Sequence, residues 1–393
     1  MSLPHTSPTS PAPAVRLIEL DGLRGLAAVV VVIHHLMLLS PTLAAVGARP
    51  GVVPTGTLET LLVLSPLHLL WSGHEAVLIF FVLSGVALVY PVARRHAQSR
   101  RFDWVDYAPR RFVRLWLPAA VATGATAATV VLIPRSGDPA LGEWITAHRP
   151  GLAVVPLARQ ILLLPRYAYH NSVLWSLHAE AAFSILLPLV VLVVALAARW
   201  RAWWVPALAG IAVPVVTGDV GTGLYLPVFA VGAALGWRWG HEAAPVPATA
   251  RRWATPASAL CLAALTVSWW PGMDSDAGQR LGGGVTLAAA AGLVVLVVRA
   301  GAMRALLRSR AVQYLGLMSF SLYLVHEPVI VSLRLATASL SPWVTVLLAP
   351  VLAAGLTWAF QRWIEAPSHR LSRRVGRRAS AWWHARWPGP AGD

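Results

Sequence analysis

The chain has 393 residues, of which 57% are hydrophobic and only 12% are charged, and its formal net charge is +16. This composition excludes a soluble globular domain and indicates a protein that lies largely in lipid. All 32 basic residues are arginine, and they stand in the gaps between apolar segments. That placement is typical of membrane topology, so we do not expect nucleic acid as a partner. A single cysteine, Cys261, excludes a disulfide framework.

The chain predicts an all-α, polytopic membrane helix bundle of about ten transmembrane helices. Segments of about 17 to 25 apolar residues are long enough to cross a bilayer. The predicted spans are 25–46, 76–93, 115–134, 176–198, 203–218, 222–237, 254–271, 281–298, 315–335 and 342–361. The fifth and sixth are interrupted by Pro and Gly, and 152–165 is too short to span, so we expect it to be interfacial or re-entrant.

The arginines predict which side of the membrane each loop faces. Of the 32, 25 stand at the N-terminus, in the even-numbered gaps between spans and in the tail. The positive-inside rule therefore places both termini in the cytoplasm. We expect a disordered tail over 1–16, with a cleaved signal peptide as the alternative, and a membrane domain over 17–365. A basic cytoplasmic tail covers 366–393 and either lies on anionic headgroups or is disordered.

Two ionisable residues of the first span point in one direction. Arg24 and His35 are eleven positions apart, so on a helix they project within about 20° of each other and about 16 Å apart along the axis. An ionisable residue near the bilayer centre indicates function by default. His34 is rotated about 100° away, and we interpret it as a structural histidine bonded to a neighbouring helix.

Several motifs resemble one known family. The segment LDGLRGLAA at 20–28, followed by His35, resembles the opening motif of the acyltransferase 3 family of membrane O-acyltransferases. Further segments resemble its later motifs in family order: FFVLSG at 80–85, RFVRLWLP at 111–118, WSLHAE at 175–180, SFSLYLVH at 319–326 and IEAP at 364–367. The chain departs from the usual pattern at His178, Ser184 and Phe320.

The resemblance implies an acyl-CoA donor, acetyl-CoA in the simplest case, used as a co-substrate with no tightly bound cofactor. Arginine offers bidentate geometry to phosphates, so Arg24, Arg111 and Arg114 are expected to bind the donor. For the neighbouring Arg110 we favour a topology signal. His35 is expected to be catalytic, either as the general base on an acceptor hydroxyl or as a residue that is itself acylated.

Other polar residues leave alternatives open. Glu180, about one and a half turns from the outer end of its span, is expected to orient a histidine or hold sugar hydroxyls, with a structural ion pair as the alternative. Tyr323 and His326 share a helical face and either contact the acceptor or join helices. His74 and Glu75 are interpreted as an exposed pair. No two histidines have the spacing of a helical zinc motif, so no metal is expected.

The sequence therefore predicts an acyltransferase of the bacterial cytoplasmic membrane. Its expected acceptor is a hydroxyl of a cell-surface glycan or lipid-linked sugar. The alternatives are acylation of a small secreted glycosylated metabolite, or a transporter that moves a glycan without chemistry. A transporter is expected to have internal repeats with broken helices, and only the fifth and sixth spans, which Pro and Gly interrupt, show such a feature.

Overall fold

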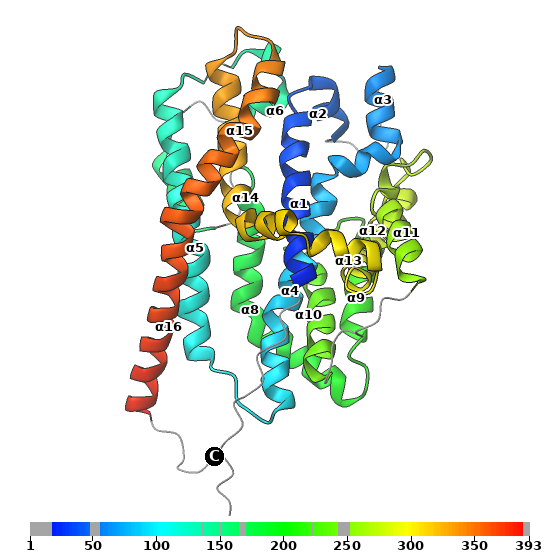
Figure 1. Cartoon of the computed structure of the whole chain (residues 1–393), viewed down its shortest axis with the longest axis vertical. Helices are drawn as coiled ribbons and strands as arrows, with labels where there is room; N and C mark the ends of the chain where they lie inside the picture. The colour runs from blue at the N-terminus through cyan, green and yellow to red at the C-terminus, as the bar shows by residue number, and fades with distance from the viewer. Residues whose placement is uncertain are drawn as a thin grey trace, which may run out of the picture.

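The computed structural model describes residues 18–47, 56–135, 137–148, 151–164, 170–221, 223–242 and 252–387. Every regular element in these ranges is a helix, which confirms the predicted fold class (Figure 1). The predicted tail at 1–16 lies outside them.

Seven helical segments are long and apolar enough to cross a membrane. They are α1 (Ile18–Met37), α4 (Gly73–Ala97), α5 (Trp104–Leu132), α8 (Leu174–Arg199), α12 (Asp276–Leu296), α14 (Arg310–Ala336) and the segment that begins with α15 (Pro342–Phe360). Each corresponds to one predicted span.

The other three predicted spans are also helical, but they are shorter. They form α9 (Val205–Thr217), α10 (Leu226–His241) and α11 (Ala254–Leu265). Helix α9 ends at Gly218, whose φ of +76° is left-handed and ends a helix readily when the residue is glycine. Helix α11 gives way to a 3₁₀ turn, η3 (Val267–Trp269), before Pro271. The described residues therefore hold seven full-length spans, where the sequence predicted about ten.

Shorter elements connect the long helices. They are α2 (Pro41–Gly47), α3 (Thr57–Leu64), η1 (Pro66–Leu70), η2 (Pro139–Leu141), α6 (Glu143–Thr146), α7 (Val154–Ile161) and α13 (Gly301–Leu307). Helix α7 falls in the stretch that is too short to span. Asn171, just before α8, lies inside the bundle, where its side chain donates a 3.0 Å hydrogen bond to the Leu324 carbonyl in the middle of α14.

Small residues let the central helices approach closely. Gly232, Gly236 and Gly240 are spaced four apart along α10 and face α4. A Cβ at Gly232 would overlap the Val82 carbonyl, so the two backbones are in direct contact there. This small-xxx-small packing is the usual way for helices to associate in lipid.

Helices α1 and α14 approach each other in the same way, and this contact positions the candidate site. A Cβ at Gly25 would lie 2.5 Å from the Gly316 amide nitrogen, so neither backbone can move apart without losing the fit. Arg24 and His35 lie on α1, and Tyr323 and His326 lie on α14. The contact therefore fixes two pairs of candidate site residues against each other.

The basic tail is helical over most of its length. Helix α15 continues through a π-helical turn (Gln361–Glu365) into α16 (Ala366–Arg386), which runs beside α5 (Figure 1). Along α16, Ser368 donates a hydrogen bond of 3.2 Å to the Val113 carbonyl, and Ser380 donates one of 2.6 Å to Asp103. The disordered alternative is therefore wrong for 366–386, because small residues at its contact face let α16 pack on α5.

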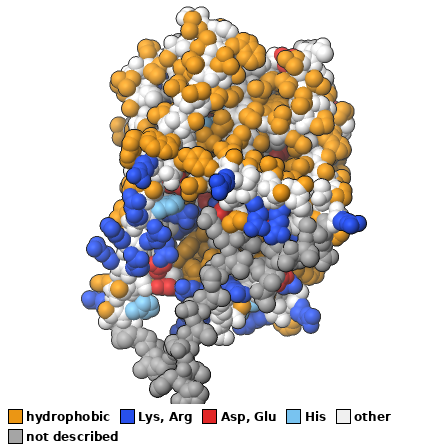
Figure 2. All heavy atoms as spheres, viewed as in Figure 1, with side chains coloured by type: hydrophobic (Ala, Val, Ile, Leu, Met, Phe, Trp, Pro, Cys, Tyr) orange, Lys and Arg blue, Asp and Glu red, His pale blue; other side chains and the backbone are white. Residues whose placement is uncertain are grey.

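The surface separates apolar and basic regions. On the face in Figure 2, hydrophobic side chains cover the upper part, and arginines gather in the lower part. We call the end where α4 finishes, with Arg94 and Arg95, the Arg-rich end. We call the end where α4 begins, at Gly73, the opposite end. Which end faces the cytoplasm remains a prediction.

Candidate active site

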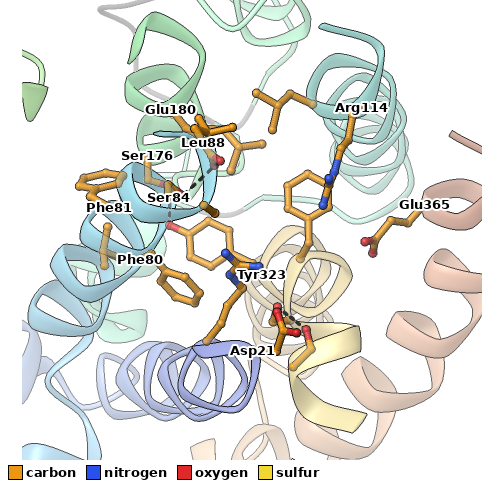
Figure 3. Close-up of a pocket in the computed structure, with 18 of the residues that line it drawn as sticks. Asp21, Phe80, Phe81, Ser84, Leu88, Arg114, Ser176, Glu180, Tyr323 and Glu365 are labelled. Carbon is orange, nitrogen blue, oxygen red and sulfur yellow. Dashed lines mark hydrogen bonds between the residues drawn. The ribbon is translucent and has the colours of Figure 1, made fainter. Parts of the chain in front are cut away.

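A cavity of about 400 Å³ opens among α1, α4, α5, α8 and α14 (Figure 3). It brings together residues that are far apart in the sequence. Among its lining residues are Arg24, Arg111, Arg114, Glu180 and Tyr323. All three predicted donor-binding arginines thus line one cavity, which we call the donor cavity.

The three arginines are not equivalent. Arg111 is already paired, because its guanidinium contacts the Glu180 carboxylate and donates a 3.0 Å hydrogen bond to the Ser184 hydroxyl. Arg24 and Arg114 make no ion pair or side-chain hydrogen bond with any described residue. Two guanidinium groups are therefore available to an anionic ligand in this cavity.

Acidic residues in the cavity moderate its charge. Asp21, Glu180 and Glu365 line it together with the three arginines, so the formal charges balance. Glu365 also accepts a hydrogen bond from the Ser321 hydroxyl at 2.5 Å. The positive charge of the cavity is consequently weaker than that of three unopposed arginines.

Glu180 lies in the cavity wall and does not contact His35. Its carboxylate pairs with Arg111 and accepts a 3.3 Å hydrogen bond from Ser84. Because α8 begins near the middle of α14, Glu180 lies deeper than a position near the outer end of a span. These contacts are those of a structural ion pair, which was the alternative interpretation of Glu180 from the sequence.

His35 and His326 form a buried pair between α1 and α14. The Nδ1 atom of His35 lies 2.9 Å from the Val31 carbonyl and 3.1 Å from Nε2 of His326. In turn, Nδ1 of His326 lies 2.9 Å from the Leu322 carbonyl. Carbonyls only accept, so this network assigns the proton of each ring to Nδ1. The lone pair of His35 then lies on Nε2, which bonds to no described residue.

Tyr323 connects the donor cavity with the histidine pair. It lines the cavity, and its ring centroid lies 5.9 Å from that of His326. Its hydroxyl shares a 2.7 Å hydrogen bond with Ser176 (Figure 3). The histidines themselves do not line the cavity. Tyr323 and His326 both join helices, Tyr323 through Ser176 and His326 through His35. A contact of either residue with the acceptor stays a prediction.

The sequence analysis missed a polar cluster beside the histidine pair. Glu327 is fully buried and accepts hydrogen bonds from Ser172 (2.5 Å) and the Val173 amide (3.0 Å), and His148 lies 2.9 Å from it. His148 follows α6, which carries Trp144, and the Trp144 ring lies 5.5 Å from that of His35. An acidic residue inside the apolar segment 315–335 was the available signal.

The charge of this cluster favours a protonated His148. Burial lowers the pKa of His148, but its hydrogen bond with Glu327 and the negative charge of that residue raise it more, so the net change is upward from 6.5. Protonated His148 would supply the counter-charge that a buried carboxylate requires.

Two further interpretations can be compared with the structure. His34 lies 2.9 Å from the Trp71 carbonyl, a contact of the structural kind that the sequence predicts. Glu75 is only 5% exposed and accepts a 2.9 Å hydrogen bond from the Trp269 indole, so the exposed-pair interpretation is wrong for this residue. The reason is that residues far along the chain, in η3, cover the start of α4.

Comparisons with known proteins agree with the motifs. A family model described as an acyltransferase domain matches residues 17–362, nearly the whole chain. No curated protein and no solved structure matches the chain. Among the described residues, no group of three or more His, Cys, Asp or Glu is arranged to hold a metal ion.

Proposed function

Because the chain belongs to the acyltransferase 3 family of membrane O-acyltransferases, we propose that it transfers an acyl group from acyl-CoA to a hydroxyl of a glycan or lipid-linked sugar. Acetyl is the simplest group, and the bacterial cytoplasmic membrane is the proposed location. The observation that carries the proposal is the donor cavity, in which Arg24 and Arg114 have no ion-pair partner among the described residues and Tyr323 lies between the cavity and the His35–His326 pair.

The donor is proposed to bind from the Arg-rich end. Arg24 and Arg114 would form charge-assisted hydrogen bonds to the phosphates of the nucleotide. The pantetheine arm would extend along Tyr323 and bring the thioester toward His35. Arg111 would act indirectly, because its pairing with Glu180 fixes the wall between α5 and α8.

His35 is proposed to act through Nε2. As a general base, Nε2 would take the proton of the acceptor hydroxyl while the hydroxyl oxygen attacks the thioester carbonyl carbon. The carbon–sulfur bond then breaks, and the CoA thiolate takes up the proton from the imidazolium. If His35 is instead acylated first, the Nε2 lone pair attacks the thioester carbonyl carbon and the CoA thiolate leaves. The acceptor hydroxyl then attacks the acyl-imidazolium, which restores neutral His35, and the hydroxyl proton passes to the thiolate. His326 supports either route by accepting a hydrogen bond from Nδ1–H of His35.

A comparison of two strains tests this function. One strain carries the wild-type gene, and the other carries the His35→Ala variant at equal membrane abundance. Mass spectrometry of surface glycans and secreted metabolites should show an acyl group that only the wild-type strain adds. An acylated secreted metabolite with unchanged glycans would support the small-molecule acceptor instead. Identical glycans and metabolites in both strains would refute the proposed activity.

A further inference from the structure

A second cavity, of about 820 Å³, lies at the Arg-rich end of the bundle, where α4, α8 and α10 finish beside one another (Figure 1). The tryptophans Trp203, Trp204 and Trp237 line it, so we call it the tryptophan cavity. It shares no lining residue with the donor cavity. A ligand in the tryptophan cavity would therefore be separate from the acyl donor.

Three arginines give the tryptophan cavity a positive charge. Arg199, Arg201 and Arg238 line it, and none of the described residues in its lining is acidic. Arg238 is paired at 2.8 Å with Glu242, which lies outside the lining. Arg199 and Arg201 are exposed and make no ion pair or side-chain hydrogen bond with any described residue. Two guanidinium groups are therefore available to an anion there.

The backbone at Arg201 favours glycine rather than arginine. Arg201 follows Trp200, the C-cap of α8, and its φ of +59° is left-handed. Its amide donates a 2.9 Å hydrogen bond to the Ala198 carbonyl, and the Ala202 amide donates one of 2.9 Å to the Ala197 carbonyl. This is the Schellman helix ending, in which glycine is the usual residue at the left-handed position. A residue with a Cβ is unfavourable there, so what arginine contributes is its charged side chain.

A histidine pair adds another polar group to the tryptophan cavity. The Nδ1 atom of His241 lies 2.9 Å from the Trp237 carbonyl, and its Nε2 atom lies 3.0 Å from Nδ1 of His96. Because a carbonyl only accepts, a neutral His241 carries its proton on Nδ1 and accepts a hydrogen bond from Nδ1–H of His96. The Nε2 atom of His96 bonds to no described residue. A protonated His96 can therefore donate from Nε2 to an anion.

An apolar stripe of α8 leads to the arginines along the outer surface of the bundle. Leu192, Leu196 and Arg199 are spaced four and three residues apart, so they share one face of the helix. Leu192 and Leu196 line the cavity and are 52% and 45% exposed. Trp200 and Trp204 are also exposed, and indole rings are typical of the boundary between a membrane and water. A ligand with a hydrocarbon chain and an anionic head matches this order of side chains.

We propose that the tryptophan cavity binds an anionic glycerophospholipid, with its phosphate at Arg199 and Arg201 and an acyl chain along Leu192 and Leu196. A zwitterionic headgroup fits less well, because its ammonium group would face arginines and no carboxylate of the described lining. A soluble phosphate compound would leave the exposed leucines without a matching apolar group. The proposal is independent of the proposed function, because the two cavities share no lining residue.

Native mass spectrometry of the full chain tests this inference. The delipidated protein in detergent is titrated with phosphatidylglycerol and, separately, with phosphatidylcholine that has the same acyl chains. An arginine near an anionic headgroup contributes about fivefold to affinity. With two available arginines, the wild type should bind phosphatidylglycerol about 25-fold more tightly than phosphatidylcholine. Equal affinity for the two lipids would overturn the inference.

Arginine variants locate the binding. Arg201→Gly removes a charge and gives the left-handed position its usual residue, so phosphatidylglycerol affinity should fall about fivefold while the melting temperature is unchanged or raised. Addition of Arg199→Gln should reduce the affinity about fivefold again. Arg377→Gln removes the same charge from an exposed position on α16, which packs on α5, and should keep wild-type affinity. Wild-type affinity in Arg199→Gln/Arg201→Gly, or an equal loss in Arg377→Gln, would overturn the inference.

A competition experiment distinguishes a lipid from a soluble phosphate compound. Acetyl-CoA at ten times its Kd should not displace phosphatidylglycerol from the wild type, because the donor cavity and the tryptophan cavity share no lining residue. Displacement would mean that the tryptophan cavity binds nucleotide phosphates, and it would overturn the assignment to a lipid. Lipid selectivity in a chain that transfers no acyl group would contradict the proposed function and leave the lipid site standing.

Discussion

Replacement of Arg111 and replacement of Arg114, the two arginines of the segment RFVRLWLP, should have different effects on the protein. Arg114→Ala removes a guanidinium that has no partner among the described residues, so the fold loses no ion pair. Arg111→Ala removes the partner of Glu180, whose side chain is 21% exposed. We therefore expect Arg114→Ala to weaken donor binding and Arg111→Ala to lower stability.

The sizes of these effects follow from the contacts. A charge-assisted hydrogen bond contributes about 1.5 to 3 kcal/mol, so loss of Arg114 should weaken acyl-CoA binding about 10- to 150-fold. An unpaired, partly buried carboxylate should cost roughly 1 to 3 kcal/mol of unfolding free energy in Arg111→Ala. Glu180→Gln in the Arg111→Ala background removes the unpaired charge and should recover part of that loss.

Two measurements on purified protein in detergent decide the matter. Calorimetric titration with acetyl-CoA gives donor affinity, and thermal unfolding without ligand gives stability. Arg114→Ala should weaken acetyl-CoA binding and leave the melting temperature unchanged, while Arg111→Ala should lower the melting temperature. Wild-type acetyl-CoA affinity in Arg114→Ala would refute the assignment of this cavity to the donor.

Three further predictions concern topology and the polar cluster around Glu327. Reporters placed at the C-terminus and between α4 and α5 should both report cytoplasm, and either one outside would contradict the arginine-based topology. Glu327→Ala leaves the His148, Ser172 and Val173 donors without their acceptor and should lower the unfolding free energy by about 3 to 6 kcal/mol, measured against the exposed Asp276→Ala as control. Because the pKa of His148 is raised, its pairing stabilises the fold fully below pH 6.5 and less as the pH rises through that raised pKa. The melting temperature of the wild type should therefore fall over that range relative to His148→Gln, and parallel curves would contradict the pairing.

Helical geometry accounts for what the sequence predicted about α1. The spacing of Arg24 and His35 places them on one face of a single helix, and the structure directs them to the donor cavity and to the adjoining histidine pair. Which side chains share a face of one helix depends only on the helical period, so the sequence of that segment alone predicts it.

Relations between segments were not predictable in this way. The contact of Glu327 with Ser172 joins residues 155 positions apart and depends on how the residues just before α8 pack against α14. The tryptophan cavity is formed by the ends of several helices, and its arginines and histidines come from separate segments of the sequence. The arginines of 370–386 predicted contact with lipid headgroups. In the structure α16 packs on α5 through small residues, Ser368, Gly376 and Ser380, and a charge pattern does not predict such a contact.

The central claim is that His35 carries the transfer, and the most direct test compares acyl transfer by His35→Ala and His34→Ala at matched membrane abundance. His35→Ala should lose essentially all transfer while it still inserts and binds acetyl-CoA, since a general base or nucleophile supplies rate more than affinity. His34→Ala should retain substantial transfer, because the contact that it loses is with the Trp71 carbonyl. A fully active His35→Ala enzyme would contradict the account.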